Sequence, residues 1–178
     1  MPYAECLFDF GYLTHFGHHT MYQFTNEHGE RVRSQYSNAD EGDAAMIENW
    51  NRVVKPEDKV YHLGDVFIHR KARFVLDQLN GKKVLIKGNH DIFSLDNYTP
   101  YFYDIRAYHR LDKFVLSHIP IHPQSVEKVK GNIHGHLHAH RVLDKQGNPD
   151  RLYMSVCVEH INYTPIELSE VITYFNEL

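Results

Sequence analysis

The sequence predicts an α/β protein in which helices cover parallel strands. Three observations lead to this prediction. Short apolar strands alternate with amphipathic segments over residues 40–91, glycine and proline stand at element ends, and strand-like segments dominate after residue 100. The chain has 178 residues, an ordinary size for one domain, and contains no repeat or low-complexity linker. We therefore expect a single domain over residues 1–178.

The first elements are a strand, a loop and a helix. Residues 3–10 are rich in aromatic and aliphatic side chains and predict a strand, followed by a loop over 14–19 that carries three histidines. Between residues 40 and 54, apolar side chains recur every three or four positions, with acidic residues in the first turn where the helix dipole favours anions. This pattern predicts an amphipathic helix that ends before Pro56.

A strand, a helix and a second strand follow. Residues 59–63 predict a strand that ends at Gly64 and Asp65. Residues 70–79 predict a helix with Phe74, Val75 and Leu79 facing inward, and residues 84–86 predict the next strand. A helix between two apolar strands is typical of a crossover connection, so we expect these strands to be parallel.

The second half of the chain is richer in strands. Residues 105–108 and 114–116 predict two strands joined by a turn around residues 111–113. Residues 131–134 and 152–158 predict two more strands, and residues 169–175 predict a final helix.

Charge and composition exclude several classes of function. The 19 basic and 23 acidic residues give a net charge of −4, which disfavours binding to extended nucleic acid or to an anionic membrane. Two cysteines, Cys6 and Cys157, cannot build a disulfide framework, and we find no signal peptide and no apolar run of about 20 residues. We expect a cytoplasmic protein. The 15 histidines point to metal or acid–base chemistry.

Polar motifs follow the predicted strands at the point where each strand ends. His15 follows the first strand, Asp65 the second, the segment 88–91 (Gly-Asn-His-Asp) the third, and His118 the strand after residue 113. In an α/β sheet these ends share one rim, where ligands bind. We therefore expect the motifs to lie close together.

A fifth motif, Gly-His-Leu-His over residues 135–138, places two imidazoles two positions apart, on the same side of an extended backbone. Together the motifs offer nitrogen and oxygen ligands without a thiolate, which suits Mn, Fe, Ni, Co or Zn in a catalytic site. The six candidate ligands are His15, Asp65, Asn89, His118, His136 and His138. We interpret seven other histidines as packing or surface residues: His62, His69, His109, His122, His134, His140 and His160.

The order of these motifs resembles the calcineurin-like metallophosphoesterase superfamily. Its pattern is Asp-x-His, Gly-Asp, Gly-Asn-His-Asp/Glu, His and Gly-His-x-His, and the last four stand here at residues 64–65, 88–91, 118 and 135–138. The segments 14–18, 47–51, 61–65 and 85–91 are similar to the small bacterial and phage branch. The resemblance implies a four-layer α/β sandwich of two mixed sheets flanked by helices.

The resemblance also implies a centre of two divalent metal ions, with manganese as the leading choice. Asp65 would bridge the two ions, and a hydroxide between them would attack phosphorus in line, so no protein nucleophile is needed. The implied ligands are His15 and His138 at the first ion, and Asn89, His118 and His136 at the second.

Further roles follow from the same resemblance. His90 would protonate the leaving oxygen, and Asp91 would hold the His90 ring. His18 and Asn89 are candidate contacts to the substrate, although a packing role for His18 is an equal alternative. Residues 93–103 contain several aromatic side chains and predict a lid or base-stacking surface, or else a dimer interface or a small satellite core.

The first motif departs from the family. Leu13 stands where the superfamily has a metal-binding aspartate, and a leucine cannot bind a hard cation. Simple loss, which would weaken the first metal site, is the preferred interpretation, and replacement by Asp9 is the alternative.

The sequence therefore predicts a metallophosphoesterase that hydrolyses phosphodiesters of nucleotides or nucleic-acid ends. Because the net charge is −4, small nucleotides are preferred over long nucleic acid as partners, and a homodimer is an open alternative to a monomer. The alternatives in function are a phosphomonoesterase, and a catalytically weakened scaffold that binds other proteins.

Overall fold

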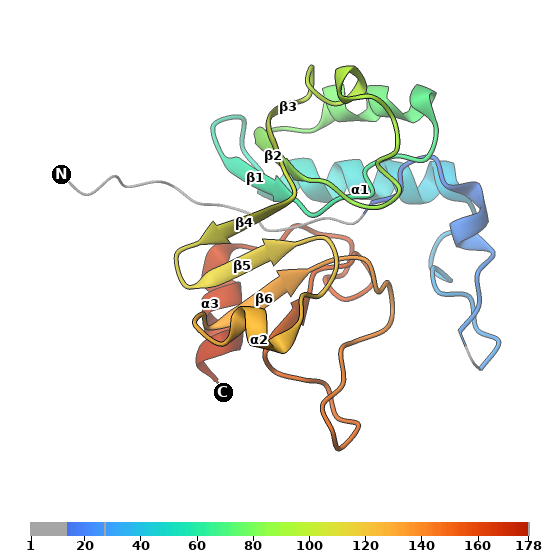
Figure 1. Cartoon of the computed structure of the whole chain (residues 1–178). Helices are drawn as coiled ribbons and strands as arrows, with labels where there is room; N and C mark the ends of the chain where they lie inside the picture. The colour runs from blue at the N-terminus through green and yellow to red at the C-terminus, as the bar shows by residue number, and fades with distance from the viewer. Residues whose placement is uncertain (1–13, 27, 178) are drawn as a thin grey trace.

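The computed structural model describes residues 14–26 and 28–177 and contains two β-sheets with helices beside them (Figure 1). The first sheet is parallel, in the order β1-β2-β3, with strands Lys59–His62, Lys82–Ile86 and Phe102–Arg106. The second sheet has the order β4-β5-β6-β7, with strands Tyr108–Leu111, Phe114–Ser117, Gly131–His134 and Tyr153–Ser155. Its β4–β5 pair is antiparallel and its other pairs are parallel.

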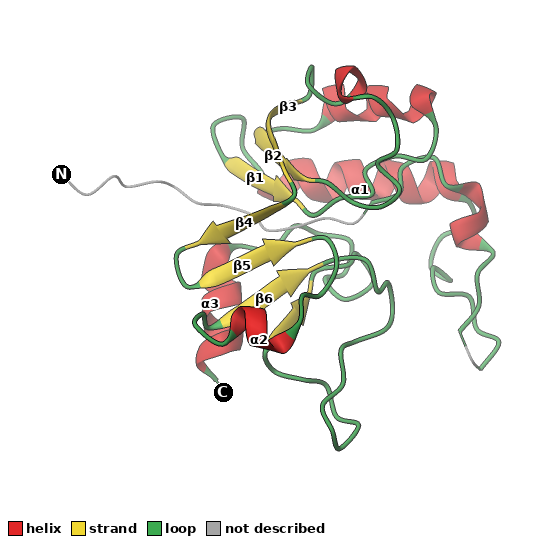
Figure 2. Cartoon of the chain, in the orientation of Figure 1, coloured by secondary structure: helices red, strands yellow, loops and turns green. Residues whose placement is uncertain are grey.

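The helices flank these sheets, as Figure 2 shows by colour. The α-helices are α1 (Ala39–Val53), α2 (Pro123–Val126) and α3 (Leu168–Asn176). Three 3-10 helices complete the set: η1 (His19–Tyr22), η2 (Arg70–Gln78) and η3 (Leu95–Asn97). None of the helices within residues 14–26 and 28–177 has the length and apolar character needed to cross a membrane.

Helix α1 matches its sequence pattern. Asn38 caps it, because the Asn38 side chain accepts a hydrogen bond of 3.0 Å from the Glu41 amide. Met46 and Trp50, four positions apart, are fully buried on its inner face. The helix ends at Val53, ahead of Pro56, as predicted.

Two hydrophobic cores hold the sheets. In β1, Val60 packs into the first core beside α1 and η2, whereas Tyr61 packs into the second core. In β2, Leu85 and Val84 alternate in the same way. The second core also contains side chains of β5, β6 and α3, so the first sheet is covered on both faces, as parallel sheets require.

Three sequence predictions differ from the structure. The predicted helix 70–79 is a 3-10 helix over Arg70–Gln78, in which Leu76 is buried and Phe74 is 54% exposed instead of facing inward. Leu79 is buried as predicted, in extended backbone just after the helix. No single strand covers 105–108: β3 ends at Arg106 beside β2, and the chain passes through Ala107 to the second sheet.

The predicted strand 152–158 is shorter, because the Val156 amide makes the last bond to β6, at His134, and the chain then turns. The other strands and the βαβ crossover are confirmed, whereas the predicted strand over residues 3–10 lies outside the described residues.

The aromatic segment 93–103 serves mainly as core. Phe93 and Tyr98 stack on Phe67, with ring centroids 5.6 and 5.0 Å away, and Tyr98 is fully buried. Phe102 is buried as well, whereas Tyr103 is 59% exposed. These side chains belong to the first hydrophobic core, so the segment is part of the main core and not a satellite core.

His62, at the end of β1, ties the N-terminal loop to the turn after the strand. Its Nδ1 accepts a hydrogen bond from the Gly64 amide at 3.2 Å, and its Nε2 lies 3.3 Å from the Thr14 hydroxyl. The Thr14 hydroxyl donates to the Val66 carbonyl at 2.7 Å, so it accepts from His62. Because Nδ1 must be an acceptor, this network requires a neutral imidazole.

We predict that acid destabilises the fold through His62. Burial lowers the pKa of His62 to about 3, while the unfolded residue titrates near 6.5. The unfolded state therefore binds a proton first, and stability present above pH 6.5 is lost as the pH falls toward 3, by about 1.4 kcal/mol per pH unit. Urea unfolding in EDTA between about pH 7 and 5 should show a shallower pH dependence for His62→Gln than for the parent.

The matched control is His69→Gln, because His69 is exposed at the start of η2. This variant should keep the pH dependence of the parent. An unchanged pH dependence in His62→Gln would contradict the assignment of the effect to His62.

Candidate metal centre

The loops that follow β1, β2, β5 and β6 bring four candidate ligands together at one rim. The Asn89 Oδ1 atom lies 2.7 Å from His118 Nε2 and 2.9 Å from His136 Nδ1. The Asp65 Oδ2 atom lies 3.3 Å from His118 Nε2, and the two imidazole nitrogens are 3.2 Å apart. Asp65, His118 and His136 each offer an atom to one group within 4.8 Å.

The orientation of the His118 ring explains what this cluster can bind. His118 Nδ1 lies 2.7 Å from the Leu63 carbonyl oxygen, so Nδ1 carries the proton and donates it. In the neutral ring Nε2 is then a lone pair, and it faces the Asp65 carboxylate and the Asn89 carbonyl oxygen. Several electron-pair donors therefore converge on one point. Only a proton or a cation between them can remove the repulsion among these donors.

The ionisation of Asp65 fits this arrangement. Burial would raise the pKa of the Asp65 carboxyl, but the bond to His118 and the hydrogen bond from the His90 amide lower it to about 2. Burial would likewise lower the pKa of His118, but the contact with Asp65 raises it. A metal ion at this point would compete with a proton for His118 Nε2.

His15 and His138, the ligands expected for the first ion, lie on the other side of Asp65 and are called the first group. Their rings stack with centroids 5.0 Å apart, and His15 Nε2 lies 3.6 Å from Asp65 Oδ2. Burial lowers the pKa of His15 to about 3, so its ring is neutral at pH 7. Within residues 14–26 and 28–177, both ring nitrogens of His15 are buried without a hydrogen-bond partner. A neutral, unpaired imidazole beside a carboxylate is suited to bind a divalent cation.

The backbone is strained at these positions. Of the seven non-glycine residues with positive φ in the described part of the chain, four are candidate ligands: His15, Asp65, His136 and His138. Their φ values lie between 50° and 68°. Such conformations cost of order 1–3 kcal/mol each and concentrate at functional sites. The strain therefore supports a site built for binding rather than for stability.

Two glycines allow the loops to approach. A Cβ atom at Gly64 would lie 2.5 Å from the Gly88 nitrogen, and one at Gly88 would lie 2.2 Å from the Asp65 carboxylate. Both contacts are too close for any other residue, and Gly64 also has a φ of 90°. The glycines in the Gly-Asp and Gly-Asn-His-Asp motifs thus serve the placement of Asp65.

Asp91 has a different role from the predicted one. Its carboxylate accepts hydrogen bonds of 2.8 to 2.9 Å from the backbone amides of Asp65, Val66 and Gly88. Asp91 is 1% exposed, so it fixes the two loops to each other instead of holding the His90 ring. The His90 ring is exposed, and its centroid lies 5.5 Å from that of the His15 ring.

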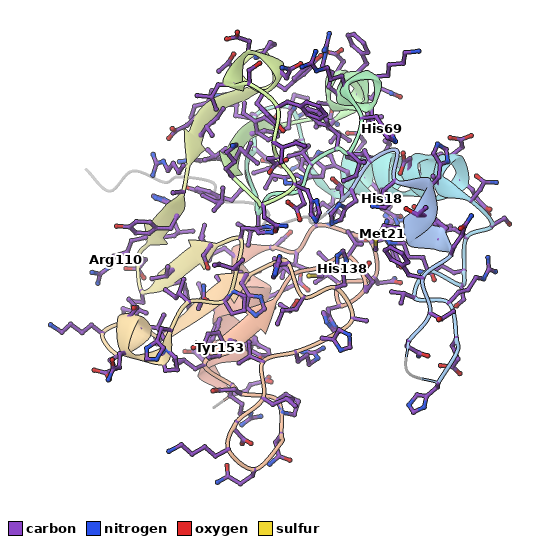
Figure 3. All side chains as sticks on the ribbon, turned by 45° about the vertical axis from the view of Figure 1, so that its right-hand side comes forward. His18, Met21, His69, Arg110, His138 and Tyr153 are labelled. Atoms are coloured by element: carbon purple, nitrogen blue, oxygen red, sulfur yellow. The ribbon has the colours of Figure 1, made fainter. Side chains whose placement is uncertain are left out.

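His18 lies beside the first group and caps a helix. Its Nδ1 accepts a hydrogen bond from the Met21 amide at 3.2 Å and lies 2.9 Å from the Thr20 hydroxyl. Its ring meets the His15 ring edge-on at 5.6 Å. Figure 3 labels His18 on the N-terminal segment and His138 on the loop after β6, both where the two halves of the molecule meet. His18 therefore caps η1 and also lies beside the His15 ring.

Sequence reasoning missed Arg33 and Glu159. Glu159 Oε1 lies 3.7 Å from His138 Nδ1 and accepts a hydrogen bond of 3.0 Å from Arg33 Nε. The Arg33 side chain is 0% exposed and the Glu159 side chain is 5% exposed. One signal was available for Glu159, because it follows the apolar run 152–158 as Asp65 follows the run 59–63. Leu13 and Asp9, the two positions at issue in the first motif, lie outside the described residues.

The donor set fits divalent metal ions of the transition series. It combines imidazole nitrogens, one carboxylate and one amide oxygen, and no cysteine is among them. Cys157 is buried, and burial raises the pKa of its thiol to about 12, so it is not a thiolate ligand. The buried, unpaired Nε2 of His15, 3.6 Å from Asp65 Oδ2, is an atom that a metal ion would satisfy.

Comparison with known proteins identifies relatives. No protein-family model matches the chain. The chain is 36% identical over 169 residues to the uncharacterized protein MJ1445 of Methanocaldococcus jannaschii, a match that covers 89% of this chain and 85% of that protein. It is also similar to the crystal structure of AQ665, a protein of unknown function from Aquifex aeolicus, with a TM-score of 0.70 and 26% identity over 94% and 97% of the two chains. With this identity and coverage, the chain belongs to the family of MJ1445.

Proposed function

We propose that this protein is a phosphoesterase that requires divalent metal ions, with the sandwich architecture of the calcineurin-like metallophosphoesterases. One observation carries the proposal. Two groups of metal-binding side chains share the carboxylate of Asp65, whose Oδ2 lies 3.3 Å from His118 Nε2 on one side and 3.6 Å from His15 Nε2 on the other. Two ions bound in this way would polarise a phosphoryl group and supply an activated water molecule.

The protein's own groups have the remaining tasks. Asp65 and Asn89 hold oxygen ligands at a fixed distance from the imidazoles, because Asp91 fixes the loop after β1 to the loop after β2. The His90 backbone N–H donates to Asp65 Oδ1 at 2.7 Å, which keeps the residue at the site, and its exposed ring lies with its centroid 5.5 Å from that of His15. From there the His90 ring would donate a proton to the leaving oxygen.

We propose a small phosphodiester, such as a nucleotide, as the substrate. The net charge of −4 opposes accumulation of a long polyanion, so the site would act on a single ester group. A phosphomonoesterase would use the same ligands. The second candidate function is a scaffold with a weakened first site, which the leucine at position 13 favours.

The first test is hydrolysis of bis(p-nitrophenyl) phosphate after Mn(II) reconstitution. We expect turnover in the parent and a loss of at least about 100-fold in Asp65→Asn, because the shared charge between the two groups disappears. The matched control is Asp112→Asn, which makes the same change at an exposed turn with nearly the same φ, 48° against 50°. Equal activity in the parent and in Asp65→Asn would reject the mechanism.

Metal content separates the enzyme from the scaffold. An enzyme should bind two Mn(II) ions per chain and keep turnover, whereas a scaffold should bind one ion or none. In the latter case activity should rise in Leu13→Asp, because the variant restores the carboxylate that the superfamily has at this position.

A further inference from the structure

A cavity lies next to the metal centre and shares two residues with it. Its volume is about 660 Å³, and its lining includes Asn89 and His118 of the centre. The side chains of β5 alternate, so that Phe114 and Leu116 enter the second core while Val115 lines this cavity. The cavity is therefore continuous with the place where a phosphoryl group would bind.

The cavity wall is mainly apolar. Ala107, Val115, Ile119 and Ile121 line it together with the ring of Tyr108. Ile119 and Tyr108 are 51% and 66% exposed, so their apolar surface is not needed by the core. Exposed apolar surface that borders a polar site indicates a place where a ligand binds.

The wall is also held in place. The Ile121 carbonyl accepts a hydrogen bond of 2.8 Å from the Tyr153 hydroxyl, and the Ile121 amide donates to Asn132 at 2.9 Å. The Ser117 hydroxyl donates to the Ile119 carbonyl at 2.6 Å. Lys87 adds a positive charge to the lining, suited to a phosphate ester.

We propose that this cavity binds the aromatic or nucleoside part of the phosphate ester whose phosphoryl group lies at the metal centre. The inference rests on the proposed function for the position of the phosphoryl group. The apolar wall would select esters that carry a ring over esters of small alcohols, because burial of a ring removes apolar surface from water.

Binding of two phosphonates to the Mn(II)-loaded protein tests this selection by calorimetry. We expect phenylphosphonate to bind at least about 10-fold more tightly than methylphosphonate. Ser125→Trp, on the exposed surface of α2 where Ser125 lines the cavity, should reduce this preference to about 2-fold or less. Gln124→Trp, at the neighbouring exposed position outside the lining, should keep it.

The outcomes separate the two proposals. Equal binding of the two phosphonates, no binding of either, or an unchanged preference in Ser125→Trp would overturn the cavity assignment. A preference for phenylphosphonate without hydrolysis of bis(p-nitrophenyl) phosphate would keep the cavity assignment and reject the phosphoesterase.

A second and independent observation concerns Glu159. In the described part of the chain, seven buried side-chain atoms lack a hydrogen-bond partner, and five of them belong to residues at the first group. They are both ring nitrogens of His15, Nδ1 of His138, Oε2 of Glu159 and Nη2 of Arg33. Buried polar atoms are normally paired, and two of these atoms, one nitrogen of the neutral His15 ring and Oε2 of Glu159, offer electron pairs beside the Asp65 carboxylate to which a cation could bind.

Glu159 is held rigidly beside His138. Arg33 pairs with Glu159 at 3.0 Å, and its guanidinium carbon lies 5.3 Å from the centre of the Tyr22 ring. Arg33 Nη1 also lies 3.4 Å from the Thr14 carbonyl oxygen and from the Tyr22 hydroxyl. The carboxylate therefore has a fixed position 3.7 Å from His138 Nδ1.

We infer that Glu159 is a positioning residue for His138 in the first metal site. A carboxylate next to Nδ1 holds the proton on that nitrogen and leaves Nε2 as the metal-binding atom, a common arrangement around ligating histidines. This inference requires a metal ion but no hydrolytic activity.

Mn(II) titration followed by electron paramagnetic resonance tests the role of Glu159. Glu159→Gln should weaken one of the two sites by about 10- to 100-fold and leave the other unchanged. Because the variant leaves Arg33 buried without its partner, Arg33→Met/Glu159→Gln serves as a second variant and should show the same loss. The control is Glu57→Gln, an exposed residue before β1, which should bind like the parent.

A His138→Gln background shows whether Glu159 acts through His138. In that background Glu159→Gln should cause no further change in Mn(II) affinity. A further 10-fold loss there, unchanged affinities in Glu159→Gln, or a parent that binds no Mn(II) would overturn the inference.

Discussion

The centre of this structure depends on one electrostatic constraint, the convergence of electron-pair donors on the Asp65 carboxylate. His118 cannot turn away from the carboxylate, because its other nitrogen donates to the Leu63 carbonyl. Asn89 lies on the same side, with its oxygen 2.7 Å from His118 Nε2. An arrangement of this kind costs free energy unless positive charge enters it. The fold thus holds several electron-pair donors close together, an arrangement that favours binding of a cation. The surrounding loops keep these donors in place.

The loops hold the donors in place through contacts of the backbone rather than through side-chain packing. The Asp91 carboxylate accepts hydrogen bonds from three backbone amides of two loops. Positions 64 and 88 are glycines, which lack the Cβ atoms that would keep those loops apart. The positive φ values of Asp65 and His15 are tolerated because these bonds and the buried sheet determine the path of the chain. In α/β proteins the buried strands typically provide a rigid scaffold, and the loops at the carboxyl ends of these strands carry the residues of the site.

Much of this site could be predicted from the sequence, because parallel strands deliver their C-terminal loops to a common rim. His15, Asp65, Asn89 and His118 could be placed together by that rule alone. The role of Asp91 could not, because its partners are backbone amides whose approach depends on loop geometry. The 3-10 character of η2 was missed because a helical apolar pattern over nine residues fits periods of 3.0 and 3.6 nearly equally well. Arg33 and Glu159 are 126 positions apart, and no local pattern reports such a pair.

The two groups around Asp65 are unequal, and the inequality has a physical cause. The group with Asn89 and His136 borders solvent, so water can hydrate it whenever no cation is bound. In the other group the His15 side chain is 2% exposed, so water cannot reach its unpaired nitrogens in the same way, whereas the His138 side chain is 31% exposed. A neutral imidazole can remain there because burial lowers the pKa of His15, whereas a lone carboxylate would need a counter-charge. Arg33 provides that counter-charge for Glu159, so the ion pair can hold a carboxylate oxygen 3.7 Å from His138 Nδ1 without leaving an uncompensated charge in the protein interior.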